Sequence, residues 1–209
     1  SRTTPRHLDE SAGAHRVEEN KLIAGGAAML PKLTHFALEN NLGNFEWACG
    51  VPGSIGGSIW GNAGARGFNG KEFESRDCAA DLVSIIAFER NGAHRVLGKN
   101  DLEFSYRKSS LGELIVASAT FALQLVSDQE TQERRAAVRE LLARRKATQP
   151  VNAACSGCIW KNPKITQGEY SGSSACALIE KRGLKNWKVG AVRISEIHGN
   201  FIVNDGKAT

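Results

Sequence analysis

The sequence predicts an α+β fold, because segments typical of strands and segments typical of helices follow one another along the chain. Residues 22–27 (LIAGGA) have the pattern of a strand that ends in a glycine turn, and residues 30–40 carry apolar side chains at helical spacing. Strand patterns return in residues 82–89 and 114–126. We therefore expect residues 22–126 to make one mixed domain.

These elements have boundary signals in the sequence. Pro31 falls in the first turn of the first helix, where its missing N–H is tolerated, and residues 40–43 (NNLG) end that helix. Asn91-Gly92 follows the second strand segment and is typical of a hairpin turn. Residues 95–97 are therefore expected to return as the partner strand.

A second, smaller α+β domain is predicted beyond a charged helix at residues 127–145. Residues 146–150 (KATQP) are typical of a link, and residues 174–182 of a short amphipathic helix closed by Gly183. Residues 200–203 are the last expected strand, and an Asn-Asp-Gly turn follows them. The expected organisation is an unassigned segment, a first domain and a second domain, at residues 1–21, 22–145 and 146–209.

Composition excludes several classes of protein. The 209 residues are 41% hydrophobic and 23% charged, which is typical of a globular chain. No apolar run approaches the roughly 20 residues that cross a bilayer, and the first residues lack the apolar core of a signal peptide. A cytoplasmic protein without membrane insertion is expected.

The net charge of +5 would suit an anionic partner, but its distribution argues against nucleic acid. The densest basic run, residues 134–146, has acidic residues interleaved in the sequence ERRAAVRELLARRK. At helical spacing Val138, Leu141 and Leu142 make an apolar stripe, and the arginines lie mostly elsewhere, which is typical of a solvated helix face. A small substrate that carries phosphates would fit the same charge.

The five cysteines, an odd number in a chain without a secretion signal, argue against structural disulfides. Cys155 and Cys158 have the C-x-x-C spacing of a redox pair or of half a zinc site. No second C-x-x-C follows and His198 is isolated, so no metal site is expected. A reversible disulfide between the two thiols is the remaining alternative.

Residues 50–67 (GVPGSIGGSIWGNAGARG) are the most informative stretch, with seven glycines in eighteen positions. Each glycine costs about 0.5 to 1 kcal/mol of backbone entropy relative to alanine, so we expect something to approach this backbone closely. Without Cβ atoms, the amides of a turn can converge on a phosphate. The spacing matches neither a dinucleotide-binding turn nor a P-loop, and the alternative is a structural bend with tight strand packing.

Four motifs occur in an order and spacing that resemble one family of enzymes. They are the glycine-rich stretch 50–67, SYRKSS from Ser105, SGCIWKNP from Ser156, and the block GLKNWKVGAVRISEIHGNFIVNDGKAT from Gly183. Together they resemble the UDP-N-acetylenolpyruvoylglucosamine reductases (UDP-N-acetylmuramate dehydrogenases), flavoenzymes of bacterial cell-wall precursor synthesis, of the type without an extra tyrosine loop. The resemblance runs from about Leu22 to the last residue.

The resemblance implies an FAD-binding domain of the vanillyl-alcohol-oxidase (PCMH-like) type and a smaller α+β substrate-binding domain. It implies an oxidoreductase with the cofactors FAD and NADPH, which converts UDP-N-acetylglucosamine enolpyruvate to UDP-N-acetylmuramate in peptidoglycan synthesis. Such an enzyme is expected in the cytoplasm, as a monomer that binds a UDP-sugar nucleotide and no nucleic acid, and serves cell-wall biogenesis, cell shape, the cell cycle and cell division. The alternative is a non-catalytic derivative that keeps the fold as a binding or structural module.

The two ends of the chain differ from the family pattern. Members begin with a further stretch that carries a G-S-N loop and completes the flavin site, and they continue to a glutamate in an E-V-R-like motif that assists protonation. Neither is found between Ser1 and Thr209. We therefore expect the chain to be truncated at both ends relative to the family.

The resemblance places nine residues of the glycine-rich stretch against the flavin and its pyrophosphate. They are Val51, Pro52, Gly53, Ser54, Gly56, Gly57, Asn62, Ala63 and Gly64. The argument from bare amides reaches the same stretch independently. For Ser54 and Asn62 the alternative is that their side chains cap turns.

The resemblance also implies the catalytic residues. Arg107 matches the arginine that binds the substrate carboxylate and stabilises the developing enolate, a task that suits a planar guanidinium. Tyr106 beside it either donates to a substrate oxygen or fills the core. Cys158 stands where most members have the serine that donates the proton, and a thiol with a reference pKa of about 8.5 can perform this step. The rival donor is Ser156, which the register of residues 161–163 disfavours, and an inert buried cysteine is the alternative.

Two further residues are assigned to substrate binding by the resemblance. Asn162 matches the family's substrate-binding asparagine, and Lys146 falls where some members place a lysine on the diphosphate. For Lys146 a solvated lysine in the basic run is the alternative. Glu196 and His198 belong to a family block whose role is expected to be structural.

Overall fold

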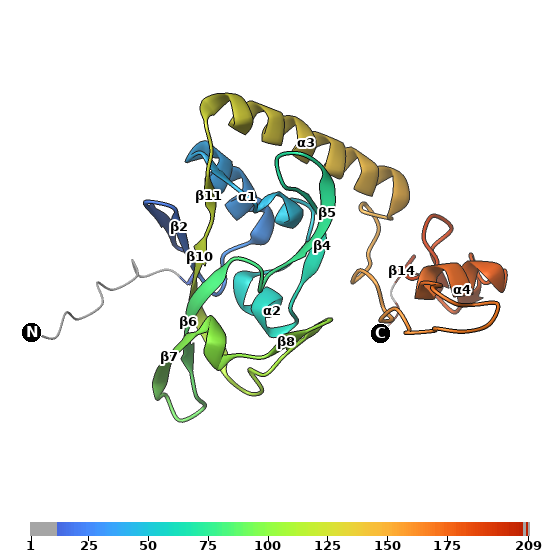
Figure 1. Ribbon diagram of the computed structural model, residues 1–209. Coiled ribbons are helices and arrows are strands. Elements are labelled where there is room, and N and C mark those ends of the chain that lie inside the picture. The colour runs from blue at the N-terminus through green and yellow to red at the C-terminus, as the bar shows by residue number, and fades with distance from the viewer. Residues whose placement is uncertain (1–11, 207, 209) are drawn as a thin grey trace, which may run out of the picture. The chain divides into compact units, whose positions relative to one another are not determined.

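The computed structural model describes residues 12–206 and 208, which form parts of two compact units (Figure 1). The first unit is Ser1–Leu142 and the second is Ala143–Thr209. Each combines helices with antiparallel strands, so the α+β fold expected from the sequence is confirmed. Among the described residues, no helix has the length and apolar character needed to span a membrane.

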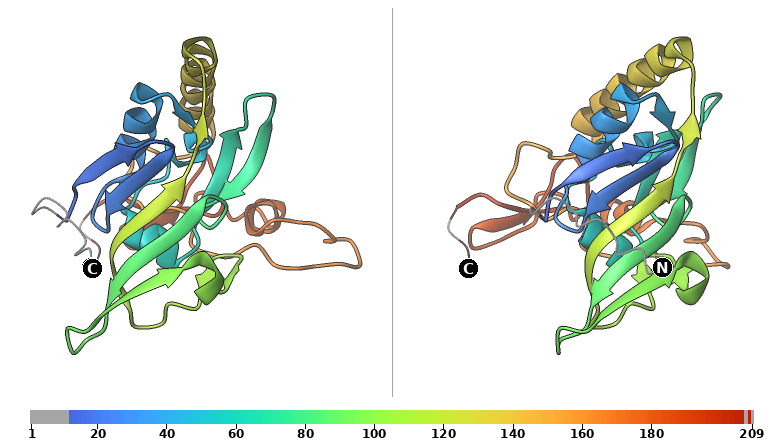
Figure 2. Two further views of the ribbon diagram at one scale, coloured as in Figure 1. Left: turned by 60° about the vertical axis from the view of Figure 1, so that its left-hand side comes forward. Right: turned by 90° about the vertical axis from the view of Figure 1, so that its left-hand side faces the viewer.

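A five-stranded antiparallel sheet is the centre of the first unit (Figure 2). In spatial order its strands are β1 (His15–Glu18), β2 (Lys21–Gly25), β10 (Ile115–Ala122), β6 (Leu82–Phe88) and β7 (His94–Gly98). β6 and β7 form the predicted hairpin, with Gly92 of its turn at a φ of 87°. β1 lies in the segment to which the sequence analysis assigned no element.

Two helices pack against this sheet and bury its apolar side chains. α1 (Leu30–Glu39) has Pro31 in its first turn, as predicted, and α2 (Ile55–Trp60) lies against β10 and β2. Burial of a large aliphatic or aromatic side chain contributes about 1.5–3 kcal/mol, so this layer is a main source of stability. Its fully buried members include Leu22, Leu30, Leu33, Ile55, Ile59, Ile85 and Phe121.

Shorter elements surround the sheet and carry the candidate site. Two of them are antiparallel hairpins, one is a pair of two-residue strands, and two are single 3-10 turns. They are β4 (Gly64–Phe68) with β5 (Phe73–Asp77), β8 (Phe104–Ser105) with β9 (Lys108–Ser109), β3 (Leu42–Gly43) with β11 (Gln124–Leu125), η1 (Glu46–Ala48) and η2 (Lys99–Asp101).

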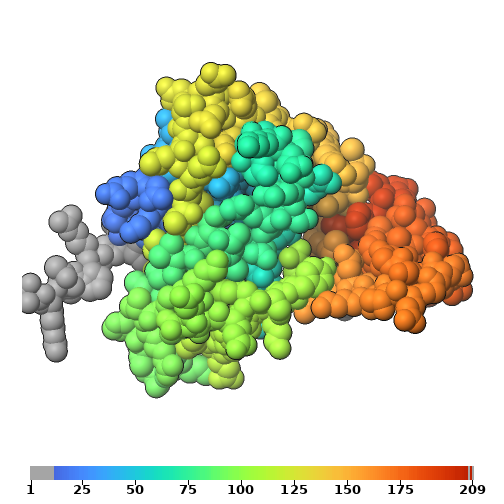
Figure 3. All heavy atoms as spheres, in the orientation of Figure 1, coloured from blue at the N-terminus to red at the C-terminus, as the bar shows by residue number. Residues whose placement is uncertain are grey.

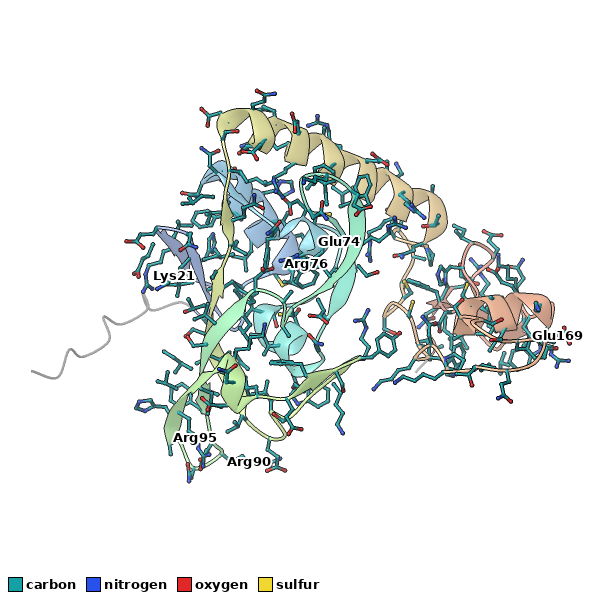
Figure 4. All side chains as sticks on the ribbon, viewed as in Figure 1. Lys21, Glu74, Arg76, Arg90, Arg95 and Glu169 are labelled. Atoms are coloured by element: carbon teal, nitrogen blue, oxygen red, sulfur yellow. The ribbon has the colours of Figure 1, made fainter. Side chains whose placement is uncertain are left out.

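Arg76 ties the β4–β5 hairpin to the start of β6. Its Nη2 lies 2.6 Å from Asp81 Oδ1 and its Nε donates to Asp81 Oδ2 at 3.0 Å, which makes a two-pronged ion pair. Glu74 on the same strand lies beside it, with Oε1 3.5 Å from Arg76 Nη1 (Figure 4). The hairpin is therefore held at its open end, next to the glycine-rich stretch.

The long charged helix predicted after the sheet is α3 (Asp128–Thr148). It extends beyond the expected end at residue 145, so Lys146 lies in its last turn and not in a link. In the space-filling view its yellow residues form an exposed ridge (Figure 3). The predicted apolar stripe is correct for Val138 and Leu141, which are buried, but wrong for Leu142, which is exposed.

Arg134, the first residue of the basic run, is buried and not solvated. Its side chain is 1% exposed, and its Nη1 lies 2.7 Å from Oε1 of the equally buried Glu46. Its Nη2 donates to Asn69 O at 3.3 Å and to Gln124 Oε1 at 3.2 Å. One guanidinium thus joins α3 to η1, to the β4–β5 turn and to β11.

The second unit combines the end of α3 and a short helix with a small antiparallel sheet. α4 (Ala175–Lys181) begins after Ser174, whose Oγ accepts a hydrogen bond from Ala177 N–H at 3.1 Å, and Gly183 with a φ of 67° follows its end. Both boundaries agree with the sequence signals. The strands, in spatial order, are β12 (Lys188–Val189), β13 (Val192–Ile194) and β14 (Ile202–Asn204).

Candidate active site

The glycine-rich stretch is not a continuous loop, because its middle forms α2 and its end enters β4. Ser54 caps α2 by accepting a hydrogen bond from Gly57 N–H at 3.4 Å. Gly56 N–H donates to Gly26 O at 2.8 Å, and a Cβ at position 56 would lie 3.2 Å from that oxygen. Close packing against the β2 end therefore overrides the low helix propensity of glycine.

Two further glycines are explained by the chain's own close contacts. A Cβ at Gly64 would lie 2.7 Å from Arg76 O, and a Cβ at Gly67 would lie 2.8 Å from Trp47 Cβ. Real Cβ atoms do not approach neighbours so closely. The structural alternative, a bend with tight strand packing, thus accounts for Gly64 and Gly67, and for Gly56 in part.

Gly53 is different, because the space above it is open. Its φ is 135°, a region that favours glycine, and nothing lies within 4 Å of a Cβ built there. Within residues 12–206 and 208, no group accepts a hydrogen bond from the amide of Gly53 or Ser54. Val51 and Ala63 are half-buried against the core, and Pro52 is exposed. Bare amides next to open space are what an anion site requires.

Asn62 has a structural task for its side chain. It is buried, with a φ of 41°, and its Oδ1 accepts from Ala79 N–H at 3.2 Å. Its Nδ2 donates to Asp77 Oδ2 at 3.2 Å and to Ser105 O at 3.1 Å. In the structure the Ser54 side chain thus caps a helix, and the Asn62 side chain joins three separate segments of the first unit.

The structure brings Arg107 to the end of the glycine-rich stretch. Arg107 occupies the turn between β8 and β9 with a φ of 56°, and its Nη1 and Nη2 donate to Asn62 O at 3.2 Å and Gly64 O at 2.6 Å. The guanidinium carbon lies 5.2 Å from the centroid of the Tyr106 ring, which is 49% exposed and does not fill the core. Two motifs that are forty residues apart in sequence thus form one surface.

Cys158 lies in the second unit, opposite Phe201. Its side chain is exposed, which excludes the alternative of an inert buried cysteine. At the other end of this pairing, Asn204 N–H donates to Ala154 O at 2.9 Å. The segment 154–158 is therefore one residue longer than the segment 201–204 with which it pairs, which makes a bulge. Such a bulge re-aims side chains, and Gly157 with a φ of 92° supplies the bend.

Asn162 and Lys146 also belong to the second unit. Asn162 Oδ1 accepts a hydrogen bond from Ala175 N–H at 3.1 Å, which fixes the segment after Cys158 to the start of α4. Lys146 is exposed and lines a cavity of about 320 Å³ together with Arg193 and the exposed Glu196. Glu196 opposes the charge of Lys146 in this lining, and Arg193 Nε lies 2.7 Å from Asp205 Oδ2, so the cavity has no excess of positive charge.

His198 is half-buried and structural, as the sequence analysis expected. Its Nδ1 accepts a hydrogen bond from Asn200 N–H at 3.2 Å, and its ring packs edge-on against Phe201. Burial lowers the pKa of His198, and the charge of Lys185 acts in the same direction while Glu180 opposes it. The accepting nitrogen requires a neutral ring.

Acidification is expected to destabilise the second unit through His198. The unfolded histidine takes a proton near its reference pKa of about 6.5, whereas the folded one resists it. Its stabilising contribution is therefore complete above that pH and is lost as the pH falls toward the lower folded pKa. Urea unfolding measures the free energy of unfolding at pH 7.5 and 5.5. The decrease between the two pH values should be smaller for His198→Gln than for the wild type, and equal decreases would contradict this assignment.

Trp60 is a candidate residue that the sequence analysis missed. Its indole N–H bonds the carbonyl of Gly112, 52 positions further along the chain, next to the Arg107 turn. No local spacing signals such a contact. The feature of the sequence that could have drawn attention to it is an aromatic residue directly before Gly61-Asn62.

Comparisons with known proteins find relatives of this chain. Residues 149–209 match the family model for the C-terminal domain of UDP-N-acetylenolpyruvoylglucosamine reductase. The protein of that name from Desulforamulus reducens is 38% identical over 200 residues, which cover 92% of this chain and 58% of the relative. The one from Clostridium tetani is 35% identical over 196 residues, with 93% and 58% covered.

A solved structure gives the same answer for the fold. The UDP-N-acetylenolpyruvylglucosamine reductase (MurB) from Thermus caldophilus aligns with a TM-score of 0.73 at 32% identity, over 96% of this chain and 65% of that one. The chain therefore spans about 58% of the length of these curated relatives. By sequence and by fold, it belongs to the UDP-N-acetylenolpyruvoylglucosamine reductase family, of which it represents a part.

Proposed function

We propose that this chain takes part in the NADPH-dependent reduction of UDP-N-acetylglucosamine enolpyruvate to UDP-N-acetylmuramate, in the cytoplasm and as a monomer. The relatives that carry the name of this reductase support the reaction class. The single observation that carries the proposal is the guanidinium of Arg107, which donates to the carbonyls of Asn62 and Gly64 at the end of the glycine-rich stretch. In this role the protein would serve peptidoglycan synthesis and, through it, cell shape and division.

The residues around Gly53 fit the pyrophosphate of FAD. Open space above Gly53 lets an anion approach, and the amides of Gly53 and Ser54 point at no protein acceptor among the described residues. Gly56 and Gly57 keep the backbone bare over the first turn of α2, and Val51, Pro52, Ala63 and Gly64 flank it. When bound there, FAD would supply the redox chemistry, that is, the transfer of a hydride from NADPH to the substrate.

Arg107 would hold the substrate carboxylate. Two carbonyls fix the plane of its guanidinium, so a carboxylate can meet it in the two-pronged geometry that arginine favours. The positive charge also stabilises the negative charge that develops next to the carboxylate during reduction. Tyr106, exposed beside it, would donate to a substrate oxygen.

Cys158 would supply the proton that completes the product. Its exposed thiol gives that proton to the carbon next to the carboxylate, and a thiolate remains on the enzyme until solvent returns a proton. Asn162, held at the start of α4, would bind the sugar nucleotide, and Lys146 would face its diphosphate. These assignments carry over from the family residue by residue.

Uptake of FAD and nucleotide-dependent turnover test the proposal. The purified chain, mixed with FAD and desalted, should keep flavin absorbance and oxidise NADPH only when the enolpyruvyl nucleotide is present. Gly53→Ala should weaken FAD binding by about tenfold or more. The φ of 135° disfavours a residue with a Cβ, and a Cβ would occupy the open space into which the pyrophosphate is proposed to bind.

Gly92→Ala is the matched control, since Gly92 has a positive φ of 87° in the remote β6–β7 turn. It should strain the backbone similarly and leave FAD affinity unchanged. A chain that retains no flavin contradicts the cofactor site. A chain that binds FAD but never oxidises NADPH in response to the nucleotide supports a binding module in place of a reductase.

A further inference from the structure

Trp60 joins the end of α2 to the segment that carries Arg107. Its indole Nε1–H donates to Gly112 O at 3.0 Å, and its own carbonyl accepts from Ser109 Oγ at 2.7 Å. Ser109 lies on β9, two residues after the Arg107 turn, and Gly112 follows in the next loop. One residue of α2 therefore holds this segment at two points.

Hydrophobic burial does not explain a tryptophan at this position. The side chain is 59% exposed, so little of its apolar surface leaves water. The polar end of the indole is the part that is engaged, because its N–H reaches the Gly112 carbonyl. Gly112, which accepts this hydrogen bond, has a φ of 57°, a left-handed backbone conformation that residues other than glycine seldom adopt.

Arg107 also has a backbone conformation that needs support. A φ of 56° is left-handed and unfavourable for a non-glycine residue, so it persists only where surrounding contacts impose it. The hydrogen bonds from Ser109 and from Trp60 act on the strand and loop directly after this turn. The position of the guanidinium over Asn62 O and Gly64 O depends on the placement of that turn.

We propose that Trp60 is a positioning residue for Arg107. Through Gly112 and Ser109 it keeps the β8–β9 hairpin at the end of α2, so that the guanidinium stays beside the bare backbone of the glycine-rich stretch. This inference rests on the proposed function, in which Arg107 binds the substrate carboxylate. Trp60 itself touches neither substrate nor cofactor in this role.

The first experiment measures the hairpin without any ligand. Trp60→Phe keeps a six-membered aromatic ring and removes the N–H donor with the five-membered ring that carries it. Amide hydrogen exchange of the full chain, read by mass spectrometry over residues 104–112, should be at least about fivefold faster in this variant. Trp187→Phe is the matched control, because Trp187 is 61% exposed in the second unit and should change nothing over residues 104–112.

The second experiment measures the substrate in the FAD-loaded chain. Trp60→Phe should raise the KM for the enolpyruvyl nucleotide about five- to tenfold, while the rate of flavin bleaching by NADPH without nucleotide stays unchanged. A general loss of folded protein would lower the rate of nucleotide reduction and the rate of flavin bleaching together. Ser109→Ala removes the other contact and should shift the same two readouts, which keeps the test valid if Trp60→Phe does not fold.

The outcomes separate this inference from the proposed function. Unchanged exchange over residues 104–112 in both Trp60→Phe and Ser109→Ala overturns it, and so does faster exchange with an unchanged KM. A wild-type chain that never reduces the nucleotide defeats the proposed function. In that case faster exchange in the variants still supports Trp60 as the residue that holds the Arg107 hairpin, and unchanged exchange rejects it.

Discussion

Replacement of Arg134 by methionine is expected to lower the free energy of unfolding of the first unit by about 3–5 kcal/mol. The change removes the 2.7 Å contact to Glu46 and leaves that carboxylate, which is 1% exposed, without its cation. It also leaves the carbonyl of Asn69 and the amide oxygen of Gln124 without this donor. Urea unfolding followed by circular dichroism measures the effect.

Two further variants identify the cause. Arg139→Met, on the exposed face of the same helix, should change the free energy of unfolding by no more than about 0.5 kcal/mol. Arg134→Met combined with Glu46→Met should recover most of the loss, because an apolar pair of similar volume replaces a buried ion pair at little cost. Equal effects of the Arg134 and Arg139 changes would refute the role of the buried pair.

The loss in Arg134→Met should depend on pH in a stated direction. Burial raises the pKa of Glu46 in the wild type, and the hydrogen bond and charge of Arg134 partly offset this rise. Without Arg134 the pKa of Glu46 should rise further. A carboxyl group whose folded pKa lies above its unfolded value of about 4.3 loses stability as the pH rises through this window. The variant should therefore be closer to the wild type at pH 5 than at pH 8.

Cys158→Ala is expected to reduce product formation by at least about 100-fold, the range for loss of a general acid. Bleaching of the flavin by NADPH should remain normal, because that half of the reaction needs no proton from this thiol. Stopped-flow absorbance follows the bleaching, and chromatography of the nucleotide follows the product. Unimpaired product formation would remove Cys158 from the mechanism.

Two neighbouring changes serve as controls for Cys158. Cys155→Ala removes the half-buried thiol three positions earlier and should leave turnover intact. Cys158→Ser restores a hydroxyl donor of the kind that the resemblance assigns to most family members, so it should regain part of the activity lost in the alanine variant. If the Cys155 and Cys158 changes are equally damaging, the acid is not specific to residue 158.

Local signals were sufficient for several elements. Pro31 and the apolar spacing after it predicted α1, Asn91-Gly92 predicted the β6–β7 hairpin, and Gly183 predicted the end of α4. Each of these signals acts within a few residues of the element that it defines. Such elements can therefore be predicted from the sequence without knowledge of long-range contacts.

Contacts between distant residues were not predictable in this way. Glu46 and Arg134 are 88 positions apart, and the arginine occurs in a run whose other members are mostly solvated, so spacing alone favoured an exposed face. The helix α2 was hidden for another reason. Its two glycines argue against a helix, and only packing against Gly26 makes one favourable.

The candidate site was predicted in part. The motif resemblance selected Arg107 and the stretch 50–67, and the structure places them together in the first unit. The resemblance could not distinguish glycines that would contact a ligand from glycines that contact other parts of the chain, because a Cβ is excluded for steric reasons in both cases. Coordinates make that distinction: Gly64 and Gly67 face protein atoms, whereas Gly53 faces open space.

The interior ion pair of α3 and η1 also restricts how this protein can diverge. A single substitution that removes the charge at either position leaves the other charge unpaired in an apolar interior, so descendants that lack the pair must pass through a poorly folded ancestor or acquire both changes together. Random libraries with one substitution per gene should be depleted at both positions, while paired apolar replacements survive.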